Sequence, residues 1–176
     1  CGNRALEICM TDIDPEKAKI FFRHDANAGT NANAKDVRVK SGIGALVGHQ
    51  DVIDDYIFDP CGYSLNSAKG GQVCTIHITP EEGFSYASVE FCSTLDDEAS
   101  ADANPQEATC EAIRKVCDIF GPKKIHVAIT TNGGNKGSGD QGEEAEFTSE
   151  DCFSAGYRKA FSTVQDLSGG NGTEVQ

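Results

Sequence analysis

Hydrophobic and polar residues alternate in several short stretches of the chain, which is typical of β-strands with one buried face. Between residues 73 and 79 the apolar side chains occupy every second position, and His77 lies on the opposite face. Similar stretches occur at residues 5–10, 51–58, 84–91 and 124–131. Glu81-Glu82-Gly83 separates two of them and has turn chemistry, so it predicts an antiparallel hairpin.

Other stretches carry the signals of helices. Asp14 and Pro15 provide an N-cap and a first helical residue for a helix that ends near His24. Residues 42–47 predict a short apolar helix. Apolar residues between 113 and 120 recur at helical spacing after the sequence Asn104-Pro-Gln-Glu107, which resembles a capping box. We expect the apolar side of this helix to pack against the apolar faces of the predicted strands.

The adjacent hairpin strands and the two-sided alternation predict an α+β fold, with an antiparallel β-sheet covered by helices on one face. We expect a core at residues 1–131, interrupted by a mobile surface loop at 25–35 that is rich in Asn, Ala and Gly. Beyond it we expect a flexible Gly-rich loop at 132–144, a C-terminal helix or strand at 145–168 and a disordered tail at 169–176.

Composition and charge narrow the functional classes. The chain has 176 residues, 38% of them hydrophobic, which fits one domain or a large half of a bigger one. Fifteen basic and 28 acidic residues give a net charge of -13, which disfavours binding to nucleic acid or anionic lipid. No stretch approaches a membrane span and no signal peptide pattern is present, so we expect a cytoplasmic protein. The missing initiator Met suggests a piece of a longer protein.

The cysteines and histidines do not predict a metal site. Eight cysteines are scattered through the predicted helices and strands without a secretory signal, which favours reduced and mostly structural thiols. The chain has no Cys-x-x-Cys or His-x-x-x-His spacing, so we expect no bound metal. We interpret His24 as solvated and His126 as structural or solvated, although His126 could share the inner face of its strand.

Ser64 and His77 are the sharpest candidates for acid–base chemistry. The turn at residues 60–64 places Ser64 near the strand that carries His77, and an imidazole titrates near pH 6.5. From the residues alone, an ordinary hydrogen bond between two polar side chains is the simpler interpretation. A Ser/His hydrolase is disfavoured, because the Gly-x-Ser-x-Gly elbow is absent and no Asp is evidently placed to orient His77.

The sequences PCGYSLN at 60–66 and TIHITPEEGFSYAS at 75–88 resemble the signature region of eukaryotic S-adenosylmethionine decarboxylases, most closely the plant and algal ones. The resemblance is weaker at residues 6–15, 41–43 and 113–122 and fades beyond about residue 131. It implies a four-layer αββα sandwich built from two similar halves, of which this chain would be the C-terminal one.

The resemblance also implies a chemistry. In this family the proenzyme cuts itself at a Glu-Ser bond and leaves a pyruvoyl group, whose carbonyl forms a Schiff base with the substrate amine and takes up the electrons released with carbon dioxide. The product is the aminopropyl donor for spermidine and spermine. This chain has no Ser-Glu-Ser-Ser stretch, so the pyruvoyl group is expected from the N-terminal half and β chain of the same proenzyme. The chain alone should be inactive.

Individual positions match the family's functional residues. Ser64 and His77 match residues that serve self-processing, with His77 as the base for the β-elimination. Phe58 matches the aromatic residue that stacks on the substrate adenine, and Glu81 matches the carboxylate that holds the ribose hydroxyls. A noncatalytic regulatory paralogue, which binds a small cation or an active partner subunit, is the alternative for the whole protein.

Glu7 and Glu90 are expected to point away from the helices. In metazoan members of the family an acidic cluster between the sheets binds putrescine, and these two glutamates match members of that cluster. Asn3 stands where an Asp is usual, however, and plant enzymes do not require putrescine. Pairing with Lys or Arg from the other half is the alternative, since buried carboxylates are costly without a partner.

Overall fold

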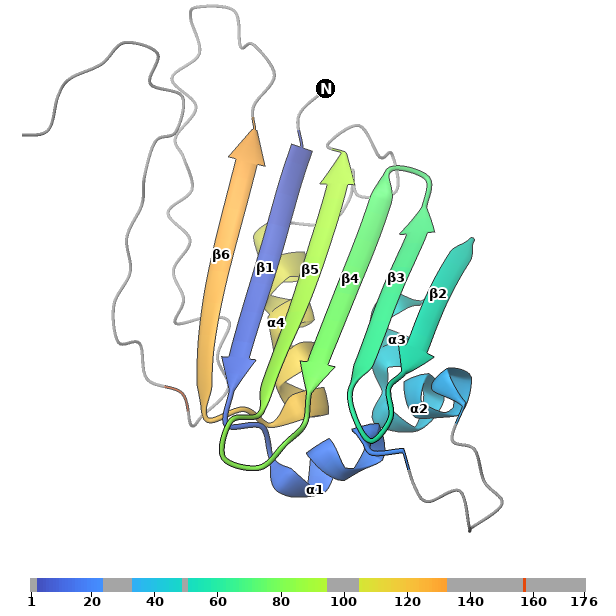
Figure 1. The fold of residues 1–176 in the computed structure, drawn as a ribbon. Helices are drawn as coiled ribbons and strands as arrows, with labels where there is room; N and C mark the ends of the chain where they lie inside the picture. Colours follow the sequence, from blue (N-terminus) through green and yellow to red (C-terminus); the bar gives the residue numbers. More distant parts are fainter. Residues whose placement is uncertain (1–2, 24–32, 49–50, 95–104, 133–156, 158–176) are drawn as a thin grey trace, which may run out of the picture.

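The computed structural model describes residues 3–23, 33–48, 51–94, 105–132 and 157. A six-stranded sheet has the order β2-β3-β4-β5-β1-β6, and every neighbouring pair is antiparallel (Figure 1). The strands are β1 (Asn3–Thr11), β2 (Val52–Ile57), β3 (Tyr63–Lys69), β4 (Gln72–Thr79), β5 (Tyr86–Thr94) and β6 (Lys124–Asn132). The predicted α+β class is therefore confirmed.

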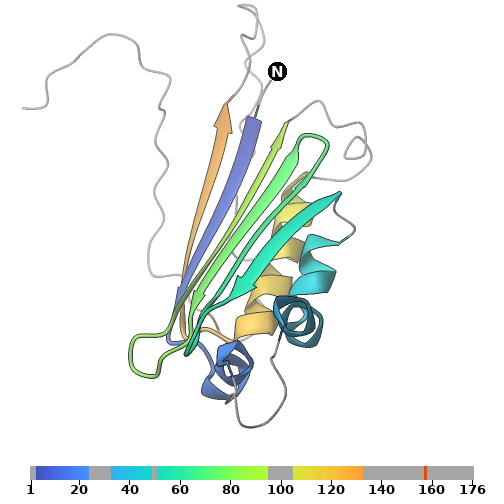
Figure 2. The same cartoon turned by 45° about the vertical axis from the view of Figure 1, so that its right-hand side comes forward.

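The helices lie on one face of this sheet, and no described helix covers the other face, which we call the open face (Figure 2). They are α1 (Pro15–Ala18), the 3-10 helix η1 (Lys19–Phe21), α2 (Ala34–Ser41), α3 (Ile43–Val47) and α4 (Pro105–Phe120). The predicted helix at 15–22 is thus one short α-helix that tightens into a 3-10 turn. Asp14 caps it, because its carboxylate accepts from the backbone N–H groups of Glu16 and Lys17.

The core lies between the sheet and the helices. Ile8 and Met10 of β1 are fully buried there, as are Ile113, Val116 and Phe120 along one side of α4. Each such side chain contributes about 1.5–3 kcal/mol through removal of apolar surface from water. The alternation along the strands gives one face to this core and leaves the polar positions on the open face.

Strand β3 was not predicted as a strand. Residues 60–64 were expected to form a turn, but Tyr63 and Ser64 already belong to β3, which pairs with β2 and with β4. Gly70 and Gly71 connect β3 to β4, with Lys69 opposite Gln72 in the register. Two consecutive glycines between strands are a signal for a tight hairpin, which the prediction did not use.

Helix α2 is also an addition to the predicted elements. Its first residues, Ala34 and Lys35, fall in the expected loop at 25–35, most of which lies outside the described residues. The side chain of Asn33 caps this helix by accepting from the N–H of Asp36 at 2.7 Å. The expected segments at 132–144, 145–168 and 169–176 lie outside the described residues, apart from residue 132 at the end of β6 and Tyr157.

One expectation about the cysteines was wrong. Cys110 is disulfide-bonded, whereas we expected reduced thiols. The described part of the chain also contains five free cysteines, which are Cys9, Cys61, Cys74, Cys92 and Cys117. Cys74 is buried against the helical side, as expected of a structural thiol.

Candidate functional site

Ser64 and His77 contact each other on the open face of the sheet. They are direct register partners in the β3–β4 pair, and Ser64 Oγ lies 3.1 Å from His77 Nδ1. Ser64 is therefore placed by a strand and not by the expected turn. Because a β-strand alternates its side chains, Ile76 and Ile78 hold β4 in the core while His77 points outward. The pair can exchange a proton if the imidazole carries the matching tautomer.

A pocket of about 360 Å³ lies next to this pair. It is lined by Phe58, Cys61, Gly62, Tyr63, His77, Ile78, Thr79 and Glu81. Phe58 is 46% exposed, and its ring meets the ring of Tyr56 edge to face with centroids 4.9 Å apart. An exposed aromatic ring held by a neighbouring ring is suited to stacking on a flat, electron-rich or cationic ligand.

Glu81 supplies a hydrogen-bond acceptor to the same pocket. Its Oε2 atom is buried and has no hydrogen-bond partner within the described residues. Cys61 lies beside it, and burial first, then the charge and hydrogen bond of Glu81, raise the pKa of the Cys61 thiol. A buried acceptor without a partner is costly, so a ligand that donates a hydroxyl hydrogen to Oε2 would gain from it.

Gly62 fixes the loop that carries Phe58. The N–H of Phe58 donates to the carbonyl of Gly62, and the N–H of Gly62 donates to the carbonyl of Phe21, both at 2.9 Å. The φ angle of Gly62 is +110°, which a residue with a side chain rarely adopts. The loop between β2 and β3 is therefore tied to η1 at the position next to Phe58.

Glu7 and Glu90 lie opposite each other on the open face, as register partners in the β1–β5 pair. Both are exposed, and neither forms an ion pair with another described residue. Cys9 lies 3.5 Å from Glu7 Oε1, and the hydroxyl of Tyr86 donates to the Cys9 sulfur at 3.2 Å. Two neighbouring carboxylates repel each other, so a positive charge placed between them would be favourable.

The sequence model of the adenosylmethionine decarboxylase family matches residues 2–175. The chain belongs to this family. It is 37% identical over 151 residues to the S-adenosylmethionine decarboxylase proenzyme of Oryza sativa subsp. japonica, covering 84% of this chain and 34% of that protein. It is 39% identical over 131 residues to the corresponding proenzyme of Pisum sativum, covering 74% of this chain and 33% of that protein. The chain thus spans about a third of the length of these relatives.

A solved structure of the decarboxylase family has the same type of fold. The Trypanosoma brucei AdoMetDC-delta26 monomer matches with a TM-score of 0.53 and 26% sequence identity, over 72% of this chain and 45% of that chain. The antiparallel sheet with helices on one face therefore matches the fold of a solved member of this family. None of the helices in the described part of the chain is long and apolar enough to cross a membrane.

Some residues around this pocket were not found from the sequence. Tyr56 lies in β2, two residues before Phe58, and the rings of the two residues are in contact; this spacing of two was the available signal. Cys61 was interpreted as a packed thiol, although it lines the pocket next to Glu81. His126 is exposed on the open face opposite Cys9, at a distance of three strands from His77 in the sheet order.

Proposed function

We propose that this chain is the C-terminal portion of a pyruvoyl-dependent S-adenosylmethionine decarboxylase, which makes decarboxylated S-adenosylmethionine for spermidine and spermine synthesis. The observation that carries this proposal is the pocket lined by Phe58, Glu81 and His77, in which Glu81 Oε2 has no hydrogen-bond partner among the described residues and Ser64 contacts His77 from beside the pocket. The chain would pack the open face of its sheet against a similar upstream half, in a four-layer αββα sandwich.

The described residues fit the substrate of such an enzyme. The exposed ring of Phe58 would stack on the adenine, and its face would also attract the nearby sulfonium cation. Glu81 Oε2 would accept a hydrogen bond from a ribose hydroxyl, while the Cys61 thiol interacts with the same carboxylate. A nucleoside bound in this way would satisfy the buried acceptor and cover the exposed ring together.

The decarboxylation needs an electron sink, which none of the side chains lining the described pocket can supply. A pyruvoyl group from the upstream half of the proenzyme supplies that sink when it is present. The pocket is compatible with it, because its edge offers a hydroxyl and an imidazole that can contact a carbonyl oxygen. This chain would bind and orient the substrate in that arrangement.

The Ser64–His77 pair would serve the self-cleavage that precedes catalysis. In the self-processing known for this family, the upstream serine attacks the preceding carbonyl to give an ester, and a base then removes a proton in the β-elimination. His77 is the proposed base, since its imidazole is exposed on the open face and an imidazole nitrogen can accept a proton. Ser64 would hold the ring through Nδ1, which directs Nε2 away from Ser64.

Two further assignments follow from the family. Glu7 and Glu90 would form part of an acidic cluster for putrescine, or would pair with Lys or Arg of the upstream half. The partners would then be S-adenosylmethionine, the N-terminal half and the β chain of the same proenzyme. The domain boundaries and the cytoplasmic location stay predictions.

Mass spectrometry of the complete gene product tests this function. We expect two chains, the larger of which starts with a pyruvoyl group, and substrate-dependent release of carbon dioxide. A single uncleaved chain would instead favour the regulatory paralogue.

The His77→Ala variant of that gene product should stall processing at the ester, because the base for the elimination is missing. Hydroxylamine, which cleaves esters, should then split the stalled protein into two chains. His126→Ala is the matched control, since it removes an exposed imidazole from the same face. Normal processing of His77→Ala would remove this residue from the mechanism.

A further inference from the structure

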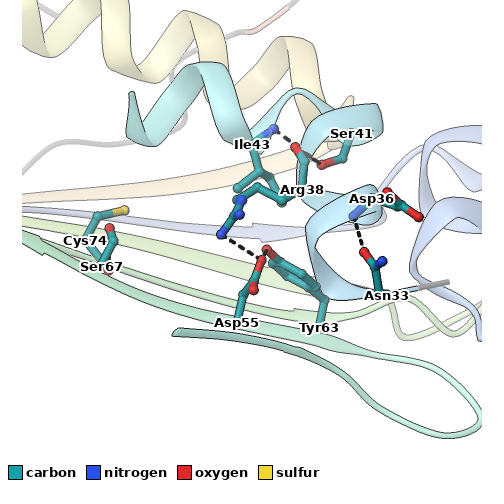
Figure 3. A network of polar contacts seen from close by, with 9 residues as sticks. All are labelled: Asn33, Asp36, Arg38, Ser41, Ile43, Asp55, Tyr63, Ser67 and Cys74. Carbon is teal, nitrogen blue, oxygen red and sulfur yellow. Dashed lines mark hydrogen bonds and ion pairs between the residues drawn. The ribbon is translucent and has the colours of Figure 1, made fainter. Parts of the chain in front are cut away.

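A buried polar network lies beneath the β2–β3 hairpin, on the helical side of the sheet. The NH1 atom of Arg38, in α2, lies 3.1 Å from Asp55 Oδ2, and the hydroxyl of Tyr63 donates to the same oxygen at 2.9 Å (Figure 3). Only 16% of the Arg38 side chain and 12% of the Asp55 side chain are exposed. Tyr63 is 1% exposed.

The network does not follow from the needs of the core alone. Apolar residues of similar volume often stabilise a buried position as well as an ion pair does, because charges lose their hydration on burial. Burial, followed by the hydrogen bond to Asp55, raises the pKa of Tyr63, so its hydroxyl stays a donor. One carboxylate oxygen therefore joins a helix and two strands through two directional contacts.

These contacts act on β2, the strand that leads into Phe58, the exposed aromatic residue of the pocket. β2 is an edge strand that pairs only with β3 among the described elements, so fewer backbone hydrogen bonds hold it than hold a central strand. Phe58 follows the last residue of β2, Ile57, and the register partner of Ile57 is Tyr63. Asp55 precedes Phe58 by three residues and faces the opposite side of the strand.

The loop that joins β2 to β3 is held by further contacts. The carbonyl of Phe21 accepts from the N–H of Gly62, and the ring of Phe21 packs on the ring of Tyr63 with centroids 5.9 Å apart. The backbone contacts fix the loop, whereas the Arg38–Asp55–Tyr63 network fixes the edge strand that leads into it. Phe58 lies between the two.

We propose that Arg38, Asp55 and Tyr63 are positioning residues for Phe58, which hold the edge strand so that the ring is in place before a nucleoside binds. This inference rests on the proposed function for the role of Phe58 as a nucleoside shelf. Preorganisation of a binding residue raises affinity, because the ligand does not have to order the strand. The network therefore acts on nucleoside affinity through Phe58 and touches no ligand through Arg38 or Asp55.

Hydrogen exchange of the ligand-free full-length gene product tests the positioning step. In Asp55→Asn and Tyr63→Phe we expect the amide of Phe58, which donates to Gly62, to exchange about tenfold faster through local opening. Amides in the centre of β5 should exchange at the wild-type rate. Unchanged exchange at Phe58 in both variants would overturn the proposal, whatever the enzyme's activity.

Adenosine binding, measured by calorimetry on the same proteins, tests the consequence. Tyr63→Phe removes one hydrogen bond and should weaken adenosine binding about fivefold. Arg38→Met should weaken it as well, whereas Arg38→Lys keeps the charge and should restore it to within about twofold of wild type. In turnover assays Arg38→Met should raise KM for S-adenosylmethionine more than it lowers kcat.

Ile113→Val is the control for a general loss of stability, because it trims a fully buried residue of α4 away from the pocket. Equal losses of adenosine affinity in Ile113→Val and Tyr63→Phe would overturn the positioning role. Wild-type protein that is folded but does not bind adenosine would refute the proposed function itself. Changed exchange together with unchanged adenosine affinity would refute the link between the network and the pocket.

Discussion

Gly62→Ala should destabilise the protein and weaken nucleoside binding at the same time. The φ angle of +110° at Gly62 lies in a region that L-residues rarely adopt. A Cβ atom there would also lie 3.4 Å from the backbone oxygen of Ile78 and 3.6 Å from Cβ and Cδ2 of Phe58. The added methyl group therefore meets a backbone atom on one side and the proposed adenine shelf on the other.

The two parts of this cost can be separated with a second glycine. Gly83 has φ +90°, and a Cβ atom there would have no neighbour within 4 Å. Gly83→Ala should thus lower the free energy of unfolding only through backbone strain at positive φ, by about 1–2 kcal/mol. Gly62→Ala carries a backbone cost of the same kind, and its methyl group would lie at ordinary van der Waals distance from the Ile78 carbonyl, so crowding adds little to it.

The assay is urea unfolding of both variants and of wild type, with adenosine binding measured on the folded proteins. We expect both variants to lower the free energy of unfolding by about 1–2 kcal/mol, with unchanged m values. Adenosine affinity should fall in Gly62→Ala and stay at the wild-type value in Gly83→Ala. Wild-type stability of either variant, or wild-type adenosine affinity in Gly62→Ala, would refute this reasoning.

Three further predictions concern the rest of the described fold. Ser85→Ala should cost about 1–2 kcal/mol in urea unfolding, because the buried Ser85 Oγ accepts from the N–H of Ile13 at 2.9 Å, and a stability equal to wild type would contradict this. Iodoacetamide at pH 8.5 should modify the exposed Cys92 well before Cys74, since burial raises the pKa of Cys74 to about 12, and similar labelling rates would argue against that burial. The raised pKa of Cys74 also predicts that the free energy of unfolding falls as the pH rises from about 9 toward 12, because the thiol ionises near pH 8.5 in the unfolded chain but stays protonated in the folded one. Urea unfolding at several pH values should show a smaller decline in Cys74→Ala than in wild type, and an equal decline would contradict the prediction.

Most strands could be predicted from the sequence because their side chains alternate between the buried core and the open face. β1 and β4 place large aliphatic residues against α4 and polar residues on the open face, so their period of two is unambiguous in the sequence. β3 places the small polar Ser67 among its buried residues, which weakens the same signal. Its existence was nevertheless encoded in Gly70-Gly71, whose tight connection sets Ser64 opposite His77.

The missing helix and the buried network have a different origin. Val37 is the only buried residue of α2, so that helix has almost no apolar stripe from which a period of 3.6 could be recognised. The contact between Arg38 and Asp55 depends on how α2 packs on the edge strand, which is a tertiary relation between residues 17 positions apart. Neither charge carries a local signal of its partner.

The pairing of Ser64 with His77 limits where insertions and deletions in the coding sequence can be tolerated. Adding a single codon within β4 ahead of His77 would turn the imidazole toward α4 and expel Ile76 or Ile78 into water, because consecutive side chains take opposite sides. Two added codons would restore the sides but shift the partners. Insertions and deletions that survive selection should therefore accumulate in the connections between strands and be purged from β3 and β4.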